Sequence, residues 1–290
     1  MTFLFRFLNI LPHRAALGLG ALLGGLFWAF SKRKVDKAEA RCVAALGVGV
    51  TTARKIVMSS YVNVGRSVVE FVRLERLAPR LTSLVTIEGE EHLAKAMARG
   101  KGVLVMTAHM GNWELGGARM VSEGYAIAPL YTPQRNIGGV NDLVSALRSS
   151  AAGMEMIPSE GAGMREIFRA LRNGKLLVLL QDLDARKEGV VVPFLGLPAS
   201  TAVGIVKMHR KLGAPIVPMM ILRNPDGVTH KIRIYEILSD LPDEDGNLFG
   251  ANMEKSLKMC NNILAGWVTE HPEQWMWLLD RWGSTAGTAS

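Results

Sequence analysis

The sequence predicts an α/β fold: a central, largely parallel sheet flanked by helices, with an N-terminal membrane-associated helix. From about Thr82 onward, short apolar runs alternate with helical stretches, as is typical of a parallel sheet covered on both faces. An uncharged apolar segment precedes this region, and the 290-residue chain is long enough to bury a full core. These observations divide the chain into segments 1–34, 35–80, 81–283 and 284–290.

Segment 1–34 is expected to be a hydrophobic, membrane-associated segment. Its uncharged part, Ala15–Phe30, has 16 residues, a little short of the ~20 that a straight helix needs to span a bilayer. A full crossing and a shallow or tilted insertion therefore both remain open. By the positive-inside rule, the basic residues that follow favour a cytoplasmic location for the downstream domain: Lys32, Arg33, Lys34, Lys37 and Arg41. The alternative is a buried helix of a soluble fold.

Residues 35–80 are expected to form a helical collar between the membrane segment and the main domain. Lys37–Leu77 is predicted to be helical because apolar residues recur there at spacings of three and four: Val57, Tyr61, Val64, Val68 and Phe71. Pro79 is expected to end this helix.

Segment 81–283 is predicted to be the α/β domain. Its strand candidates are Leu84–Ile87, Val103–Met106, Ala126–Tyr131, Met154–Ile157, Leu176–Leu180, Val190–Val192, Pro215–Leu222 and Lys231–Ile237, the last pairing antiparallel at an edge. Its helix candidates are Glu90–Ala98, Trp113–Glu123, Val140–Ser150, Met164–Arg172, Ala202–Leu212 and about Asn252–Glu270. Residues 284–290 are expected to be a disordered tail.

A histidine at the end of an apolar strand is the most informative feature of the chain. Ligands of open α/β sheets bind at the carboxyl ends of strands, where His109 follows Val103–Met106. Asn112 can cap the next helix, and Glu114 lies in its first turn. A carboxylate on one ring nitrogen of His109 would fix the tautomer and make the other nitrogen a base. The alternative is that Glu114 only complements the helix dipole.

Three more polar residues follow predicted strands and should reach the same sheet edge. Arg135 comes after Ala126–Tyr131, and its guanidinium could bind a phosphate. Asp182 and Asp184 follow Leu176–Leu180, but no metal-ligand set of recognisable spacing accompanies them. The two cysteines lie far apart. We therefore expect no metal and no cofactor.

The loop after Val190–Val192 is predicted to lead into a helix. Its apolar residues, from Val192 to Gly196, could line a groove for an acyl chain, and Thr201 could cap the helix. Simple packing of a loop is the alternative.

Several sequence blocks resemble the bacterial lipid A biosynthesis acyltransferases, the lauroyl and myristoyl transferases. This family includes the phosphatidylinositol mannoside acyltransferase. His109 to Glu114, H-M-G-N-W-E, matches the His-x-x-x-x-Asp/Glu motif of glycerolipid-type acyltransferases. The other similar blocks are GEEHLAKAMARGKGVLVMTAHMGNWE, YTPQRN, LLQDLDARKEGVVVPFLGLPAST and HPEQWMW, so the resemblance covers most of the chain.

The resemblance implies a glycerolipid acyltransferase-like fold and a reaction. A fatty acyl chain would pass from an acyl carrier protein or coenzyme A thioester to a hydroxyl of a lipid A precursor-like glycolipid at the cytoplasmic face of the bacterial inner membrane. His109 would be the general base and Glu114 would orient it, with Asp182 as the rival for that role. The residues expected to bind substrate are Asn112, Arg135, Asp182 and Asp184.

The charge of the chain fits these partners. Lys and Arg outnumber Asp and Glu by 34 to 26, for a net charge of +8, which favours an anionic membrane surface and an acidic carrier protein. The basic residues are scattered and no recognition motif accompanies them, so nucleic acid is not an expected partner. The alternatives are a non-catalytic lipid-binding member of the same fold, an acyltransferase for a lysophospholipid or a phosphoinositide mannoside, and a lipase or thioesterase. The absence of a G-x-S-x-G elbow argues against an α/β-hydrolase.

Overall fold

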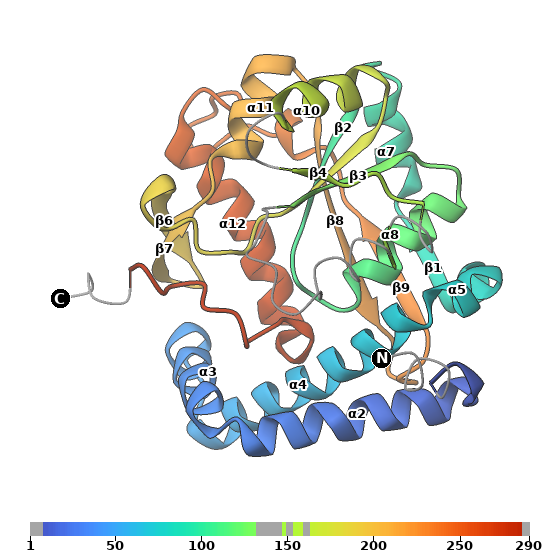
Figure 1. Ribbon diagram of the computed structural model, residues 1–290. Coiled ribbons are helices and arrows are strands. Elements are labelled where there is room, and N and C mark those ends of the chain that lie inside the picture. Colours follow the sequence, from blue (N-terminus) through green and yellow to red (C-terminus); the bar gives the residue numbers. More distant parts are fainter. Residues whose placement is uncertain (1–7, 132–146, 149–152, 159–162, 286–290) are drawn as a thin grey trace.

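The computed structural model describes residues 8–131, 147–148, 153–158 and 163–285. In this part of the chain, seven strands form one sheet in the order β1-β9-β8-β2-β5-β3-β4 (Figure 1). Neighbouring strands pair in parallel except β8 and β9, so the predicted α/β class is confirmed. The strands are β1 Val85–Glu88, β2 Val103–Thr107, β3 Ile127–Tyr131, β4 Ile157–Pro158, β5 Leu176–Leu180, β8 Ile216–Arg223 and β9 His230–Ile234.

Helices cover both faces of the sheet, and successive residues of a strand pack against helices on opposite faces. In β2, Leu104 and Met106 join one hydrophobic core, whereas Val103 and Val105 join the other. The first core includes α10 (Gly163–Arg172), α11 (Gly204–Leu212) and α12 (Met253–Glu270), and the second includes α7 (Glu90–Met97) and α8 (Trp113–Ser122). The predicted helix Val140–Ser150 lies almost entirely outside the described residues.

The C-terminal part of the sheet differs from the prediction in one respect. The last strand, β9, does pair antiparallel with β8. It is not an edge strand, however, because β1 pairs with its other side in parallel register, Val85 opposite His230. The edge is β1, which sequence order alone could not place beside the last strand.

Residues 190–201 form a β-hairpin: the predicted strand Val190–Val192 is present, but the predicted loop after it contains a second strand. Strand β6 (Val190–Phe194) pairs antiparallel with β7 (Leu197–Thr201). The prediction that Thr201 caps a helix is wrong, because its hydroxyl accepts hydrogen bonds from Arg281 and Asn261 and α11 begins only at Gly204. Arg281 is fully buried there and is therefore part of the core of the domain.

The start of the expected disordered tail is bound to the domain. Ser284 donates its backbone N–H and its hydroxyl to Asp184, and the Thr285 hydroxyl donates to the Pro198 carbonyl. Residues 284 and 285 are therefore bound to the domain, contrary to the prediction, because the Asp184 carboxylate and the Pro198 carbonyl accept their hydrogen bonds. Residues 286–290 lie outside the described part.

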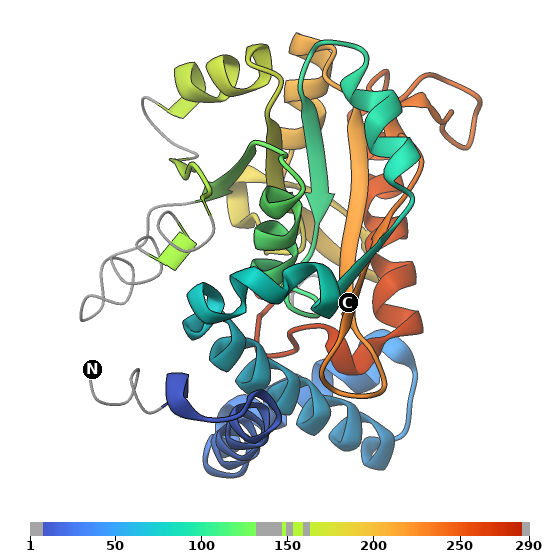
Figure 2. The ribbon, with the colours of Figure 1, turned by 90° about the vertical axis from the view of Figure 1, so that its right-hand side faces the viewer.

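Three helices form a base beneath the sheet (Figures 1 and 2). They are α2 (His13–Phe30), α3 (Lys32–Leu46) and α4 (Val50–Val72), followed by the short α5 (Leu74–Leu77), a 3-10 turn at Ala78–Arg80 and α6 (Leu81–Leu84). The collar is not the single helix that was predicted. Helix α3 ends at Gly47, which adopts φ 65°, and the chain bends by 117° between α3 and α4.

The apolar helix α2 is held against α4 by a backbone-to-backbone contact. An added Cβ on Gly24 would lie 2.3 Å from the Tyr61 carbonyl oxygen, and one on Gly65 would lie 2.2 Å from the Gly20 carbonyl oxygen. Only glycine permits this approach. By length and composition α2 could cross a membrane, but it packs along α4, as Figure 1 shows.

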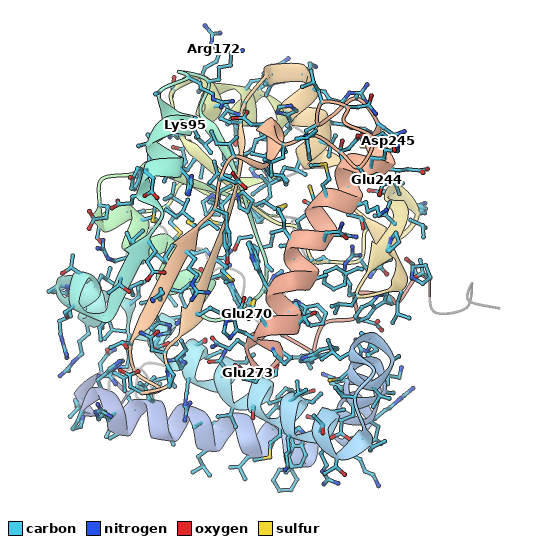
Figure 3. All side chains as sticks on the ribbon, turned by 180° about the vertical axis from the view of Figure 1, so that it is seen from behind. Lys95, Arg172, Glu244, Asp245, Glu270 and Glu273 are labelled. Atoms are coloured by element: carbon cyan, nitrogen blue, oxygen red, sulfur yellow. The ribbon has the colours of Figure 1, made fainter. Side chains whose placement is uncertain are left out.

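The far side of the molecule connects the sheet to this base. Figure 3 shows α12 from behind, with Glu244 and Asp245 near its start and Glu270 at its end. The chain then turns through a 3-10 helix, Pro272–Gln274, which packs on α4. The C-terminal aromatic segment is thereby brought between the base and the sheet.

We predict that Gly24→Ala and Gly25→Ala have opposite effects on stability. The methyl group at Gly24 would overlap the α4 backbone, at a cost of ~1–3 kcal/mol. Nothing lies within 4 Å of an added Cβ at Gly25, where alanine should be neutral or stabilise by up to ~1 kcal/mol. Urea unfolding of both variants measures the difference. Equal stabilities would mean that α2 is not docked on α4.

Candidate active site

The loop after β2 presents His109 at the carboxyl edge of the sheet. Gly111, with φ 59°, allows the sharp turn, since a Cβ there would lie 2.0 Å from the Ile221 carbonyl oxygen. Asn112 then caps α8, as predicted, by accepting from the Leu115 N–H. The C-terminal segment supports the loop from the other side: Met276 N–H donates to the His109 carbonyl, and Gly111 N–H donates to the Gln274 carbonyl.

Asp182, at the end of β5, is the partner of His109. Its Oδ1 lies 2.8 Å from His109 Nδ1, and its Oδ2 accepts from the His109 backbone N–H at 2.8 Å and from Trp275 Nε1 at 2.9 Å. The carboxylate is fully buried. Burial alone would raise the pKa of Asp182, but the charge and hydrogen bonds of His109, together with the Trp275 bond, lower it below its ordinary value. Asp182 is therefore a fixed anion behind the imidazole.

This geometry fixes the chemistry that His109 can perform. With its proton on Nδ1 facing Asp182, the imidazole carries its lone pair on Nε2. The ring is partly exposed, with 16% of the side chain accessible, and the Trp113 ring packs edge-on against it at 5.1 Å. A buried carboxylate and an oriented, partly exposed imidazole are the parts of a general base.

Glu114 occupies a different place from the one predicted. Its carboxylate pairs with Arg148, whose Nε lies 2.9 Å from Oε2, and it also accepts from Trp113 Nε1 at 3.1 Å. The prediction that Glu114 orients His109 is therefore wrong for this structure: the Trp113 ring lies against the imidazole, and Arg148 binds the carboxylate. Of the two rivals, Asp182 holds the histidine.

An apolar pocket opens beside this pair, between α8 and the sheet. Its empty volume, with its open mouth, is about 560 Å³. Glu114, Arg148 and Trp113 line it, and Trp113 also touches His109. The remaining wall is almost wholly apolar and includes Gly116, Gly117, Val178, Leu180, Met220 and Ile221. Gly116 and Gly117 are the α8 residues that border the pocket without a side chain, and they follow Trp113 and Glu114 in the same helix.

The other predicted substrate residues are not gathered at this pocket. Asn112 is 1% exposed, and its amide donates to Glu70 at 2.7 Å, so it faces the protein interior. Asp184 accepts from the backbone N–H of Arg186 and from Ser284, and holds the C-terminal segment. Burial would raise the pKa of Asp184, but these hydrogen bonds lower it. Arg135 lies outside the described residues.

Comparison with known proteins identifies the family of the chain. Residues 1–284 match the family described as bacterial lipid A biosynthesis acyltransferase. The chain belongs to this family. The lipid A biosynthesis lauroyltransferase of Escherichia coli is 25% identical, with 92% of this chain and 85% of the relative covered. The phosphatidylinositol mannoside acyltransferase of Mycobacterium tuberculosis is 26% identical, with 68% and 59% covered. A lipid A biosynthesis acyltransferase of Haemophilus influenzae is 26% identical over 66% of this chain and 57% of its own length.

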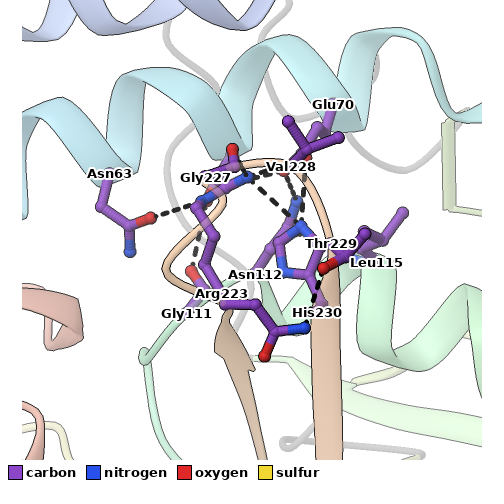
Figure 4. A network of polar contacts seen from close by, with 12 residues as sticks. Asn63, Glu70, Gly111, Asn112, Leu115, Arg223, Gly227, Val228, Thr229 and His230 are labelled. Atoms are coloured by element: carbon purple, nitrogen blue, oxygen red, sulfur yellow. Dashed lines mark hydrogen bonds and ion pairs between the residues drawn. The ribbon is translucent and has the colours of Figure 1, made fainter. Parts of the chain in front are cut away.

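This lipid A acyltransferase family member also contains a buried ionic cluster that sequence reasoning missed (Figure 4). Glu70 of α4, 1% exposed, binds Arg223 through both oxygens, at 2.9 and 2.7 Å, and His230 at 3.1 Å. The partners lie more than 150 positions away in the sequence, so no spacing reveals them. A signal was present, however: Glu70 is a lone charge among Val68, Val69, Phe71 and Val72. A charge in such a run requires a buried partner.

The pKa of Glu70 reports how strongly the cluster holds the anion. Burial would raise this pKa, but hydrogen bonds and charge from His230 and Arg223 outweigh it and lower the pKa from 4.5 to about 2.

In the described part of the chain, no group of three His, Cys, Asp or Glu side chains is placed to hold a metal ion.

We predict that Glu70 makes folding sensitive to acid. Because its pKa is lower in the folded state, its stabilisation is complete above pH 4.5 and is lost as the pH falls from 4.5 toward about 2. Between about pH 6 and pH 3 the wild type should lose about 2 kcal/mol more stability than Glu70→Gln. Urea unfolding at several pH values tests this, with the exposed Glu75→Gln as the matched control. Parallel curves for wild type and Glu70→Gln would contradict it.

Proposed function

We propose that the protein transfers a fatty acyl chain from a thioester to a hydroxyl group of a bacterial membrane glycolipid. One observation carries the proposal: Asp182, fully buried, binds both the ring and the backbone of His109. It leaves Nε2 without a hydrogen bond to the described residues, and the adjacent Trp113 ring lines an apolar pocket. Membership of the family supports the same reaction class.

The chemistry needs one base and no enzyme nucleophile. His109 Nε2 takes the proton of the acceptor hydroxyl as its oxygen attacks the thioester carbonyl. The new C–O bond forms, the C–S bond breaks, and the imidazolium returns the proton to the departing thiolate. Asp182 stabilises the imidazolium while it carries that charge. A base of this kind contributes ~10²–10⁴ in rate.

The pocket suits the acyl chain of the donor. An apolar wall beneath α8 would bind the hydrocarbon, and the polar rim at Glu114 and Arg148 would lie near the thioester. Since Arg148 is already neutralised by Glu114, the pair acts as a dipolar rim and not as an open anion site. The donor is an acyl carrier protein or coenzyme A thioester, and both are anionic partners for a chain of net charge +8.

The acceptor is a glycolipid resembling a lipid A precursor. One relative is named for lipid A biosynthesis and another for phosphatidylinositol mannoside, which favours a glycolipid over a lysophospholipid. The mannoside is the second candidate, because the mycobacterial relative matches over 68% of this chain. Mass spectrometry of membrane lipids from cells with and without the active protein identifies the acceptor.

We predict that His109→Ala abolishes acyl transfer and that Asp182→Asn lowers kcat about 10²–10⁴-fold. The asparagine keeps the size of the side chain but loses the anion that stabilises the imidazolium. Thioester consumption that depends on added lipid acceptor is the measurement. A folded His109→Ala variant with wild-type transfer would overturn the mechanism. Free fatty acid released without an acceptor would instead indicate a thioesterase, and no thioester consumption would indicate a binding protein.

The enzyme is proposed to sit on the cytoplasmic face of the membrane with α2 lying in the interface. Helix α2 is fixed along α4, which favours a flat insertion over a crossing. Its outer face exposes large apolar side chains, namely Leu22, Leu23, Leu26, Phe27 and Phe30, with Phe30 85% exposed. Lys32, Arg33 and Lys34 follow, where they would meet anionic headgroups. The carboxyl edge of the sheet faces this same base.

We predict that Leu26→Glu/Phe30→Glu releases the protein from vesicles of phosphatidylethanolamine and phosphatidylglycerol. Two charges on the face of α2 oppose burial of its apolar surface. Flotation measures the bound fraction, and Leu248→Glu serves as the control: that residue is 79% exposed and lies in the region of Asp245, far from α2 (Figure 3). Release of both variants, or of neither, would argue against α2 as the membrane contact.

A further inference from the structure

The buried cluster around Glu70 is connected to the loop that carries His109. Glu70 Oε2 accepts from the Asn112 amide at 2.7 Å as well as from Arg223, and Asn112 is three residues after His109 (Figure 4). Asn112 also caps α8 with its other amide atom. The side chain therefore joins three elements: α4, α8 and the loop.

Two further contacts bind the same loop to the cluster. The Ser67 hydroxyl, one turn before Glu70 on α4, donates to the Gly111 carbonyl at 3.2 Å and also meets Arg223. Gln274, whose carbonyl accepts from Gly111, exchanges hydrogen bonds with the backbone of Arg223 at 2.7 and 3.0 Å. Gly111 and Asn112 are thus linked to the Glu70–Arg223 pair by the side chains of α4 and by Gln274.

We propose that Glu70 is a positioning residue for His109, acting through Asn112. The inference rests on the proposed acyl transfer. Asp182 orients the ring of His109 directly, whereas Glu70 holds the loop backbone that carries His109 through its hydrogen bond with Asn112. Neither Glu70 nor Arg223 lines the pocket, so Glu70 acts without contacting substrate.

The role requires a carboxylate. Oε1 accepts from His230 and Arg223, and Oε2 accepts from Arg223 and Asn112, so both oxygens face donors. A glutamine would turn one NH₂ group toward a donor, so either Asn112 or Arg223 would lose its partner. A misplacement of ~1 Å at a reacting group costs ~10²-fold in rate.

The experiment compares Glu70→Gln with Asn63→Ala in the full-length protein. Asn63 accepts from Arg223 Nε in the same cluster, and among the described residues its side chain has no hydrogen bond to the loop. Both variants should lower the melting temperature. At a temperature where both are folded, Glu70→Gln should lower kcat about 10–100-fold with little change in KM, whereas Asn63→Ala should keep wild-type kcat. Equal kcat for the two variants would overturn the proposal.

A second variant covers the case in which Glu70→Gln does not fold. Asn112→Ser keeps a good helix cap but lacks the amide N–H that Glu70 binds. It should lower kcat and leave KM unchanged, while a residue that contacts substrate would raise KM. Retention of wild-type kcat in folded Asn112→Ser would refute the link through Asn112.

A spectroscopic measurement separates this inference from the proposed function. With ¹⁵N-labelled histidine, His109 should show a single tautomer protonated at Nδ1 in the wild type and in Asn63→Ala, its signal being identified by loss in His109→Gln. In Glu70→Gln or Asn112→Ser the two ring nitrogens should move toward averaged shifts. If both keep the wild-type spectrum, the positioning role is wrong. If the spectra change as expected while His109→Ala still transfers acyl groups, the proposed function fails and the positioning role stands.

Discussion

The contact between Asp182 and His109 organises the carboxyl edge of this protein. One buried carboxylate accepts from the backbone and ring of His109 and from the indole of Trp275, so three segments far apart in the sequence meet at one anion. Desolvating a carboxylate is costly unless its lone pairs are satisfied, and here three donors satisfy them. The loop, the end of β5 and the C-terminal segment can reach this geometry only together, which ties the active site to the completed fold.

A second buried ionic group, centred on Glu70, lies on the side of the His109 loop that faces α4. Glu70, Arg223 and His230 join α4 to the end of β8 and the start of β9, and Asn112 extends the group to α8. Removing one member would leave an uncompensated buried charge, which typically costs ~3–5 kcal/mol. A well-packed apolar cluster could supply comparable stability. We therefore assign the Glu70 group to positioning the His109 loop because of the fixed geometry that its hydrogen bonds impose.

The glycine contact between α2 and α4 fixes the proposed membrane-binding helix relative to the active-site loop. Because Gly24 and Gly65 bring the two helices together at backbone distance, the apolar face of α2 is held on the side of the base that points away from the sheet. The other side of α4 carries Ser67 and Glu70 toward the loop of His109. One helix, α4, therefore lies between the proposed lipid contact and the proposed base.

The sequence by itself determined the parallel α/β class, most strands and helices of the sheet domain, and the position of His109 at a strand end, because apolar periodicity and local capping depend on neighbouring residues. It did not determine which carboxylate meets the histidine. Glu114 is close in sequence but is turned toward Arg148, whereas Asp182 is 73 positions away and arrives only because β5 lies beside β2. The Glu70 cluster and the inner place of β9 were decided in the same way. Each depends on which distant segments become neighbours, and that is set by packing of the whole chain.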